Sequence, residues 1–261
     1  MSEKREVKIE IRDKKFLKEI FVVGVFSIIS LMLLSVVILA VPVGPSTVTP
    51  VSNVTKTATA ATIFNISGGY IATFNLTANV QNVRWKAFVG NATGSFTLAD
   101  ATGSTIYNWA SAAITGRIYA TRNSSIINWG SVNCSNATTL GNESAAMILN
   151  TTTAPSDMLT MTFNMTPGNA PFYVGATFIG ANTCPTLLTY KNSAPQSGTT
   201  DFQEVPLFTP PGNLIYETPI QSPPVVGYNG QLYNFQMLVP ENGTVGYNSS
   251  TAYYLYVELG T

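Results

Sequence analysis

The sequence predicts a mainly β protein: an antiparallel β-sandwich ectodomain, Ig-like or jelly-roll-like, that follows one N-terminal transmembrane helix. Three observations lead to this prediction. A long apolar run without ionisable side chains lies near the start of the chain. Beyond it, short segments alternate apolar and polar residues with the two-residue period of half-buried strands. Turn residues separate these segments, and many short strands between turns are typical of two packed antiparallel sheets.

The apolar run comprises residues 20–43 and follows a charged cytoplasmic head, residues 1–19, with seven Lys/Arg and five Asp/Glu. As a helix the run would be roughly 36 Å long, enough to cross the ~30 Å hydrocarbon core. A buried core helix and a cleaved signal peptide are the alternatives, but the first shows only an apolar stripe and the second is usually shorter. Lysines flank the N-terminal side of the run, so we expect a retained signal anchor with the rest of the chain outside the cell.

The chain is unusually poor in charge, since only 10% of its residues are Asp, Glu, Lys or Arg and it has no histidine. Six basic residues follow the charged head, too few to neutralise many phosphates, so we expect no nucleic-acid partner. Without histidine, Ser-His-Asp and Cys-His catalysis and the common zinc sites are excluded. We therefore expect no enzymatic activity, no cofactor and no metal. Few carboxylates also predict a fold that loses little stability in acid.

Sites of the type N-x-[ST], which accept N-linked glycans, are numerous after the apolar run. Asn75 and Asn164 lie on the polar phase of alternating segments, where a bulky glycan requires an outward position. Polar residues face water whatever their use, so the phase also fits an unmodified chain. The predicted acceptors are Asn53, Asn65, Asn75, Asn91, Asn123, Asn133, Asn136, Asn142, Asn150, Asn164, Asn242 and Asn248.

The two cysteines, Cys134 and Cys184, both lie in polar contexts after the apolar run. An even pair in an oxidising compartment predicts a disulfide. Closing this loop would stabilise the fold by about 4 kcal/mol on the chain-entropy model. Two free thiols or a cysteine nucleophile are the alternatives, and the nucleophile would have no histidine as its base.

The exterior chain divides into an extended Thr/Pro/Val tether, residues 44–59, and a β-domain, residues 60–261. A division into two subdomains near residues 205–228 is the alternative. The proline-rich residues 205–224 predict a crossing loop or edge segment, because proline cannot donate to a strand ladder. Residues 143–149 could form one or two helical turns. Strands are expected over residues 63–66, 70–76, 84–89, 95–100, 105–109, 117–121, 158–165, 172–179, 231–239 and 252–259.

Two hairpins are expected among these strands. The turn residues Ala101-Thr-Gly-Ser104 separate residues 95–100 from residues 105–109. The dipeptide Asn242-Gly243 lies between the last two strands and favours a tight exposed turn.

One stretch carries a resemblance. Trp85-Lys-Ala-Phe-Val-Gly-Asn-Ala-Thr-Gly94, the Asp100-Ala-Thr-Gly103 hairpin and the strand end Tyr107-Asn-Trp109 are similar to motifs in a group of uncharacterised archaeal surface proteins. The likeness covers roughly residues 60 to 165. It implies a surface compartment and brings no known activity or catalytic residue with it.

These features predict a membrane-anchored, N-glycosylated, extracellular structural or adhesive protein of the cell envelope. Its expected location is the cell membrane, with the C-terminal domain at the cell surface. Its expected partners are the lipid bilayer, N-linked glycans, and envelope proteins or further copies of itself. The alternative is a subunit of a pilus-like filament, in which residues 46–63 or the C-terminal residues 253–259 add a strand to a neighbour's sheet.

A remote alternative is a carboxylate-dependent, glycan-active enzyme. Asp201 and Glu204 are the closest pair along the chain, and we expect both in a solvated loop. The exterior carboxylates are Asp100, Glu143, Asp157, Asp201, Glu204, Glu217, Glu241 and Glu258.

Overall fold

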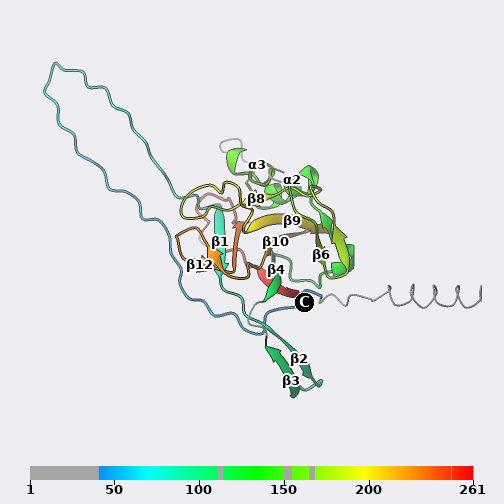
Figure 1. Ribbon diagram of the computed structural model, residues 1–261. Helices are drawn as coiled ribbons and strands as arrows, with labels where there is room; N and C mark the ends of the chain where they lie inside the picture. The colour runs from blue at the N-terminus through cyan, green and yellow to red at the C-terminus, as the bar shows by residue number, and fades with distance from the viewer. Residues whose placement is uncertain (1–40, 111–113, 150–154, 165–167, 248, 261) are drawn as a thin grey trace, which may run out of the picture. The chain divides into compact units, whose positions relative to one another are not determined.

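A computed structural model describes residues 41–110, 114–149, 155–164, 168–247 and 249–260 (Figure 1). The predicted charged head and the predicted membrane span up to residue 40 lie outside these residues. No helix in the described part of the chain has the length and apolar character needed to cross a bilayer. Residues 39–261 belong to one compact unit.

The fold is mainly β, and its largest element is a six-stranded antiparallel sheet, the central sheet. Five strands follow the order β14-β4-β10-β9-β5, and β8 pairs with β9. The strands are β4 (Thr115–Thr121), β5 (Asn133–Cys134), β8 (Leu187–Leu188), β9 (Gln203–Thr209), β10 (Asn213–Pro219) and β14 (Tyr254–Gly260). Neighbours in the sheet come from distant parts of the sequence, as Tyr119 shows, which lies between Glu217 and Tyr256.

Four smaller antiparallel pairs complete the described strands. They are β1 (Trp85–Gly90) with β13 (Phe235–Pro240), β2 (Ser95–Ala99) with β3 (Thr105–Ala110), β6 (Phe172–Val174) with β7 (Thr177–Ile179), and β11 (Val225–Val226) with β12 (Leu232–Tyr233). The helical segments are η1 (Trp129–Ser131), α2 (Ala137–Ala146), η2 (Pro155–Asp157) and α3 (Leu159–Thr162).

One face of the central sheet packs against β13 and the helices, and we call this layer the first core. Side chains alternate between faces along a strand, so Ile118 and Tyr216 point to the same side. Both belong to a buried apolar cluster with Met237 of β13, Leu140 of α2 and Leu159 of α3. The first core therefore joins the sheet to elements from both halves of the chain.

The opposite face forms a second core with the β6-β7 hairpin. Tyr119 and Ile215 point to this side and belong to a buried cluster with Phe172, Val174 and Cys184. The central sheet is thus covered on both faces. This arrangement does not confirm the predicted sandwich, in which each sheet buries one face.

Several predicted elements are confirmed. Strands form over most of residues 84–89, 117–121, 231–239 and 252–259. The hairpin around residues 101–104 also forms, with the Asp100 and Ser104 backbones hydrogen-bonded across the turn at 3.0 Å.

The prediction for the proline-rich segment was wrong, because residues 203–219 form the central strands β9 and β10. The Pro206 carbonyl accepts a hydrogen bond from Ser135 N at 3.1 Å, on the side of β5. The N and the carbonyl of an extended residue point to the same side, so the missing donor of Pro206 faces a strand of only two residues. Proline is tolerated here because the ladder on that side is short.

The strand predicted over residues 158–165 was also wrong, because this segment forms the helical turn α3. Leu159 and Phe163, four residues apart, are both buried, whereas Met161 is 60% exposed. The apolar residues of this short segment fit both the two-residue period of a strand and the four-residue spacing of a helix. Packing of Leu159 and Phe163 in the first core selects the helix.

Other local predictions also require correction. Residues 63–66 and 70–76 have no strand structure and are exposed. The last two long strands do not form a hairpin, since β13 pairs with β1 and β14 pairs with β4. Residues 172–179 form two short strands around Gly175, whose φ of 55° suits a tight turn.

The helix near residue 143 is longer than predicted. It begins after Asn136, whose side chain accepts a hydrogen bond from Thr139 N while the Thr139 hydroxyl accepts one from Asn136 N. This reciprocal cap satisfies two backbone donors that the helix leaves open.

Candidate functional site

The predicted glycan acceptors lie at the surface wherever the structure describes them. Eight of the ten described acceptor asparagines are exposed, and Asn123 and Asn242 are half-buried. Asn150 and Asn248 lie outside the described residues. Of the asparagines that lack the acceptor pattern, Asn169 and Asn234 are buried, whereas others such as Asn108 and Asn192 are exposed.

Three acceptor side chains hold local turns through their oxygen. Asn123 Oδ1 accepts a hydrogen bond from Ser125 N at 3.1 Å, and Asn242 Oδ1 accepts one from Thr244 N at 2.9 Å. Asn136 Oδ1 caps α2. A glycan attaches to the amide nitrogen, so these turns leave the reacting atom uncommitted.

Asn133 differs from these three. Its amide nitrogen donates a hydrogen bond to the Ser131 carbonyl at 3.2 Å. The amide nitrogen carries two hydrogens, so this bond leaves one of them for glycan attachment.

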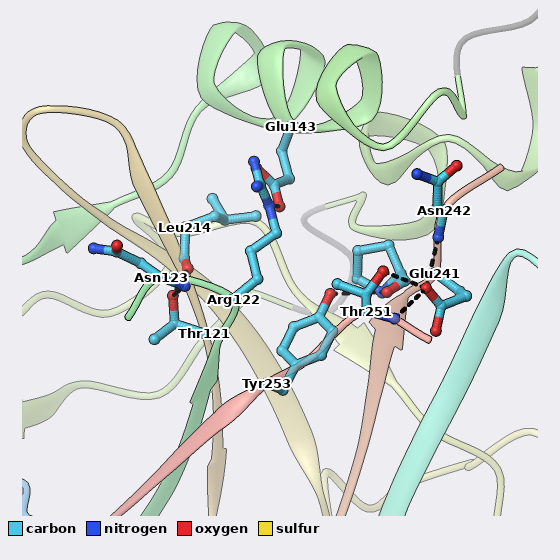
Figure 2. Close-up of polar contacts among 10 residues, drawn as sticks. Thr121, Arg122, Asn123, Glu143, Leu214, Glu241, Asn242, Thr251 and Tyr253 are labelled. Atoms are coloured by element: carbon cyan, nitrogen blue, oxygen red, sulfur yellow. Dashed lines mark hydrogen bonds and ion pairs between the residues drawn. The ribbon is translucent and has the colours of Figure 1, made fainter. Parts of the chain in front are cut away.

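Five acceptors gather at one end of the central sheet, which we call the acceptor end. Thr121, the last residue of β4, lies opposite Tyr254, the first of β14, and bonds to Leu214 at the start of β10. The acceptors on adjoining segments are Asn123, Asn133, Asn136, Asn142 and Asn242. Figure 2 shows Asn123 and Asn242 on either side of the Arg122 and Glu143 side chains.

The acceptor end is held by ion pairs. Arg122 donates to both carboxylate oxygens of Glu143, at 2.6 and 2.9 Å, and this hydrogen bonding raises the pKa of Arg122 (Figure 2). The Glu241 carboxylate lies 2.7 Å from Lys86 Nζ and accepts from Thr251 N. Burial acts to raise the pKa of Glu241, but the bonds from Lys86, Thr251 and the backbone outweigh it and lower the pKa to about 2.

A surface hollow of about 360 Å³ lies beside Glu241, along the loop between β13 and β14. Its lining residues are Val83, Arg84, Glu241, Asn242, Gly243, Thr244, Val245, Gly246, Tyr247 and Ser249. Because Glu241 is already bonded to Lys86 and Thr251, its carboxylate is a structural anion here and not a poised acid or base.

The disulfide joins the acceptor end to the second core. Cys134 is bonded to Cys184, with their Cα atoms 4.9 Å apart, which agrees with the predicted pairing. Cys184 is fully buried, and Cys134 follows Asn133 directly in the chain.

The second core contains an arginine and two buried carboxylates that sequence reasoning did not bring together. Arg117 pairs with Glu217, and Tyr119 donates to Glu258, which also accepts from Gly175 N at 2.9 Å. The Arg117 guanidinium lies over the Phe172 ring, 3.8 Å from its centroid.

These carboxylates have raised pKa values. Burial raises the pKa of Glu217 to about 7, against the lowering effect of Arg117, and Glu258 adds to the rise. Burial also raises the pKa of Glu258. The side chains of Arg117, Glu217 and Glu258 share one face only because of the register of β4, β10 and β14. No local sequence pattern could therefore have predicted this cluster.

Glu204 is a further buried carboxylate and lies on the opposite face, in β9. It accepts from Leu238 N at 2.7 Å, and burial raises its pKa well above the ordinary range. The prediction of a solvated loop was therefore wrong for Glu204. Asp201 pairs instead with Lys191, so the two carboxylates closest in sequence have different partners.

The remaining carboxylates serve local structure. Asp157 lies 3.6 Å from Arg84 NH1, and Asp100 accepts hydrogen bonds within the β2-β3 turn. Among the described residues, no group of three or more His, Cys, Asp or Glu side chains could hold a metal ion.

A second surface feature is apolar. Residues 44–82 run from the β14 edge to β1 and carry no strand, and Ile63, Ile71 and Leu76 are almost fully exposed. Single exposed apolar side chains are normal, whereas a large contiguous apolar patch marks an interaction site.

Comparison with known proteins gives no relative. No family model, no curated protein and no solved structure matches this chain.

Proposed function

We propose that this protein is an N-glycosylated surface protein, anchored in the cell membrane by the apolar run near its N-terminus, with a structural or adhesive role in the envelope. The observation that carries the proposal is the position of the acceptor asparagines. All ten that are described are exposed or half-buried, and five of them gather at the acceptor end. The proposed compartment also fits the disulfide, which persists in oxidising surroundings.

The proposal assigns the protein no catalytic role and no nucleic-acid partner. Glu204, Glu217 and Glu258 are engaged by Leu238, Arg117 and Tyr119 respectively. Glycoside hydrolysis needs two carboxylates that flank an accessible substrate. The predicted sandwich and the likeness to archaeal surface proteins belong to the same proposal.

The test is the intact mass of the protein from native membranes, before and after chemical removal of glycans. We expect a chain that keeps its N-terminal apolar run and carries several glycans. Asn133→Gln, Asn136→Gln and Asn242→Gln should each remove one glycan. Recovery of the chain from cytosol with unmodified asparagines would refute the proposal.

A second candidate function is a filament subunit that adds a strand to its neighbour. The exposed apolar side chains of residues 44–82 favour it, since a strand donated to another copy would bury them. Replacing Ile63, Ile71 and Leu76 by Ser should then abolish filaments seen by negative-stain microscopy. The anchored protein without strand exchange predicts no filaments from either chain.

A further inference from the structure

The β2-β3 hairpin carries an apolar face that the described residues leave largely uncovered. Phe96 lies opposite Trp109 and Leu98 opposite Tyr107, so these four side chains share one face. Leu98 is 56%, Tyr107 59% and Trp109 51% exposed. A two-stranded hairpin is marginally stable alone in water, so this face needs a partner.

The base of the hairpin lies at the C-terminal end of β14. A Cβ on Gly94, the residue before β2, would lie 2.6 Å from the Leu259 side chain. On the other side of the hairpin the chain enters β4 at Thr115, which lies opposite Gly260. Figure 1 shows β2 and β3 as a ribbon of their own.

The chain leading from the predicted membrane span arrives at the same end. Val43 and Val257 exchange two backbone hydrogen bonds, at 3.0 and 2.7 Å, in an antiparallel bridge. Val41 and Pro42 therefore run toward Gly260. In agreement, a Cβ on Gly175, whose N bonds Glu258, would lie 3.9 Å from Val41.

This end is also the one away from the acceptor end. Gly260 and Thr121 lie at opposite ends of the ladder between β14 and β4. Leu259 is two residues beyond Val257, or about 7 Å along the strand.

We infer that the Phe96, Leu98, Tyr107 and Trp109 face of the hairpin rests on the lipid surface in which the chain is anchored. This inference rests on the proposed function. Tyr and Trp favour the membrane-water interface, where the ring contacts acyl chains and the polar group contacts headgroups or water. Asp100 at the tip is exposed and accepts three hydrogen bonds from Thr102 and Ser104, and because a charged side chain is costly inside a bilayer we expect the tip to stay outside the hydrocarbon core.

The experiment uses the full chain, with Trp85→Phe and Trp129→Phe, in phosphatidylcholine vesicles brominated either near the headgroup or near the bilayer centre. We expect Trp109 emission to shift to the blue and to be quenched more strongly by the shallow bromines. The matched control keeps Trp85→Phe and Trp129→Phe and adds Trp109→Phe and Ile126→Trp, which places the only tryptophan at an exposed site beyond β4, near Asn123. Its emission should be unaffected. If the double variant does not fold, the wild-type chain is compared with Trp109→Phe, and the quenched fraction should disappear.

Flotation of the vesicles separates this inference from the anchor. A chain that floats with the vesicles while Trp109 is not quenched overturns the inference and leaves the anchored protein intact. If Trp109 emission shifts to the blue with rising protein concentration but is not quenched by the bromines, the apolar face binds a second copy of the chain. That result also overturns the inference. A chain that does not float overturns the anchor and the inference together.

Discussion

The two faces of the central sheet are stabilised by different physical means. The first core is built mainly from apolar side chains such as Met237, Leu140 and Leu159, and Glu204 is the buried carboxylate on that face. The second core combines apolar packing with the Cys134–Cys184 disulfide and the Arg117–Glu217 ion pair. The β6-β7 hairpin that covers it is only three residues per strand. A small cover buries little apolar surface, so the disulfide contributes to holding it in place.

The largest effect should come from removing the disulfide of the second core. The double variant Cys134→Ser, Cys184→Ser should lower the free energy of unfolding by about 4 kcal/mol, because the unfolded chain regains the freedom of a 50-residue loop. Denaturant unfolding measures it, with the reduced wild-type protein as the control. A loss below about 1 kcal/mol would mean that packing alone holds the second core.

The first core should respond to lost packing. Met237→Ala should lower the free energy of unfolding by about 3 kcal/mol, since Met237 is fully buried. Met161→Ala is the matched control, because Met161 is 60% exposed, and it should change stability by less than about 0.5 kcal/mol. Equal effects of the two variants would contradict the assignment of Met237 to the core.

The buried carboxylates of the second core should make stability depend on pH. The pKa of Glu217 is raised from 4.5 to about 7, so the folded state holds a proton that the unfolded chain has lost. Its contribution is present below pH 4.5 and is lost as the pH rises toward 7, which destabilises the fold by up to about 3 kcal/mol. Glu217→Gln should remove this dependence in unfolding experiments across that range.

Glu241, at the acceptor end, is the control of opposite sign. Its pKa is lowered to about 2, so its contribution is present above pH 4.5 and is lost between pH 4.5 and 2. Glu241→Gln should flatten only that lower range. A wild-type protein that is more stable at pH 7 than at pH 4.5 would contradict the interpretation of the second core.

The smallest effect concerns α2, which covers the first core. Asn136→Ala should lower the free energy of unfolding by about 1 kcal/mol, because it removes the helix cap. Asn136→Asp removes the glycan acceptor but keeps the cap, so it separates the two roles of this residue. Equal losses in both variants would assign the effect to the glycan.

The sequence by itself predicted a mainly β fold, the β2-β3 hairpin and the pairing of Cys134 with Cys184. It also placed Asn75 and Asn164 on outward positions, although the strands from which that phase was argued do not form. These features depend on period, turn residues and composition, which are local properties of the chain. The predicted anchor, residues 20–43, is of the same kind. It stays a prediction up to residue 40, but it was wrong for residues 41–43, which are not helical and in which Val43 pairs with Val257 of β14.

Tertiary structure alone decided the rest. Residues 158–165 could alternate as a strand or turn as a helix, and contact with the first core selected the helix. Pro206 has no backbone N–H and so disfavours a central strand locally. Its neighbour on that side, β5, has only two residues, so the ladder does not require a hydrogen bond from Pro206. Arg117, Glu217 and Glu258 are far apart in sequence and meet because three strands align in register. Pairing between distant strands depends on the free energy of the whole sheet, which no local pattern of residues contains.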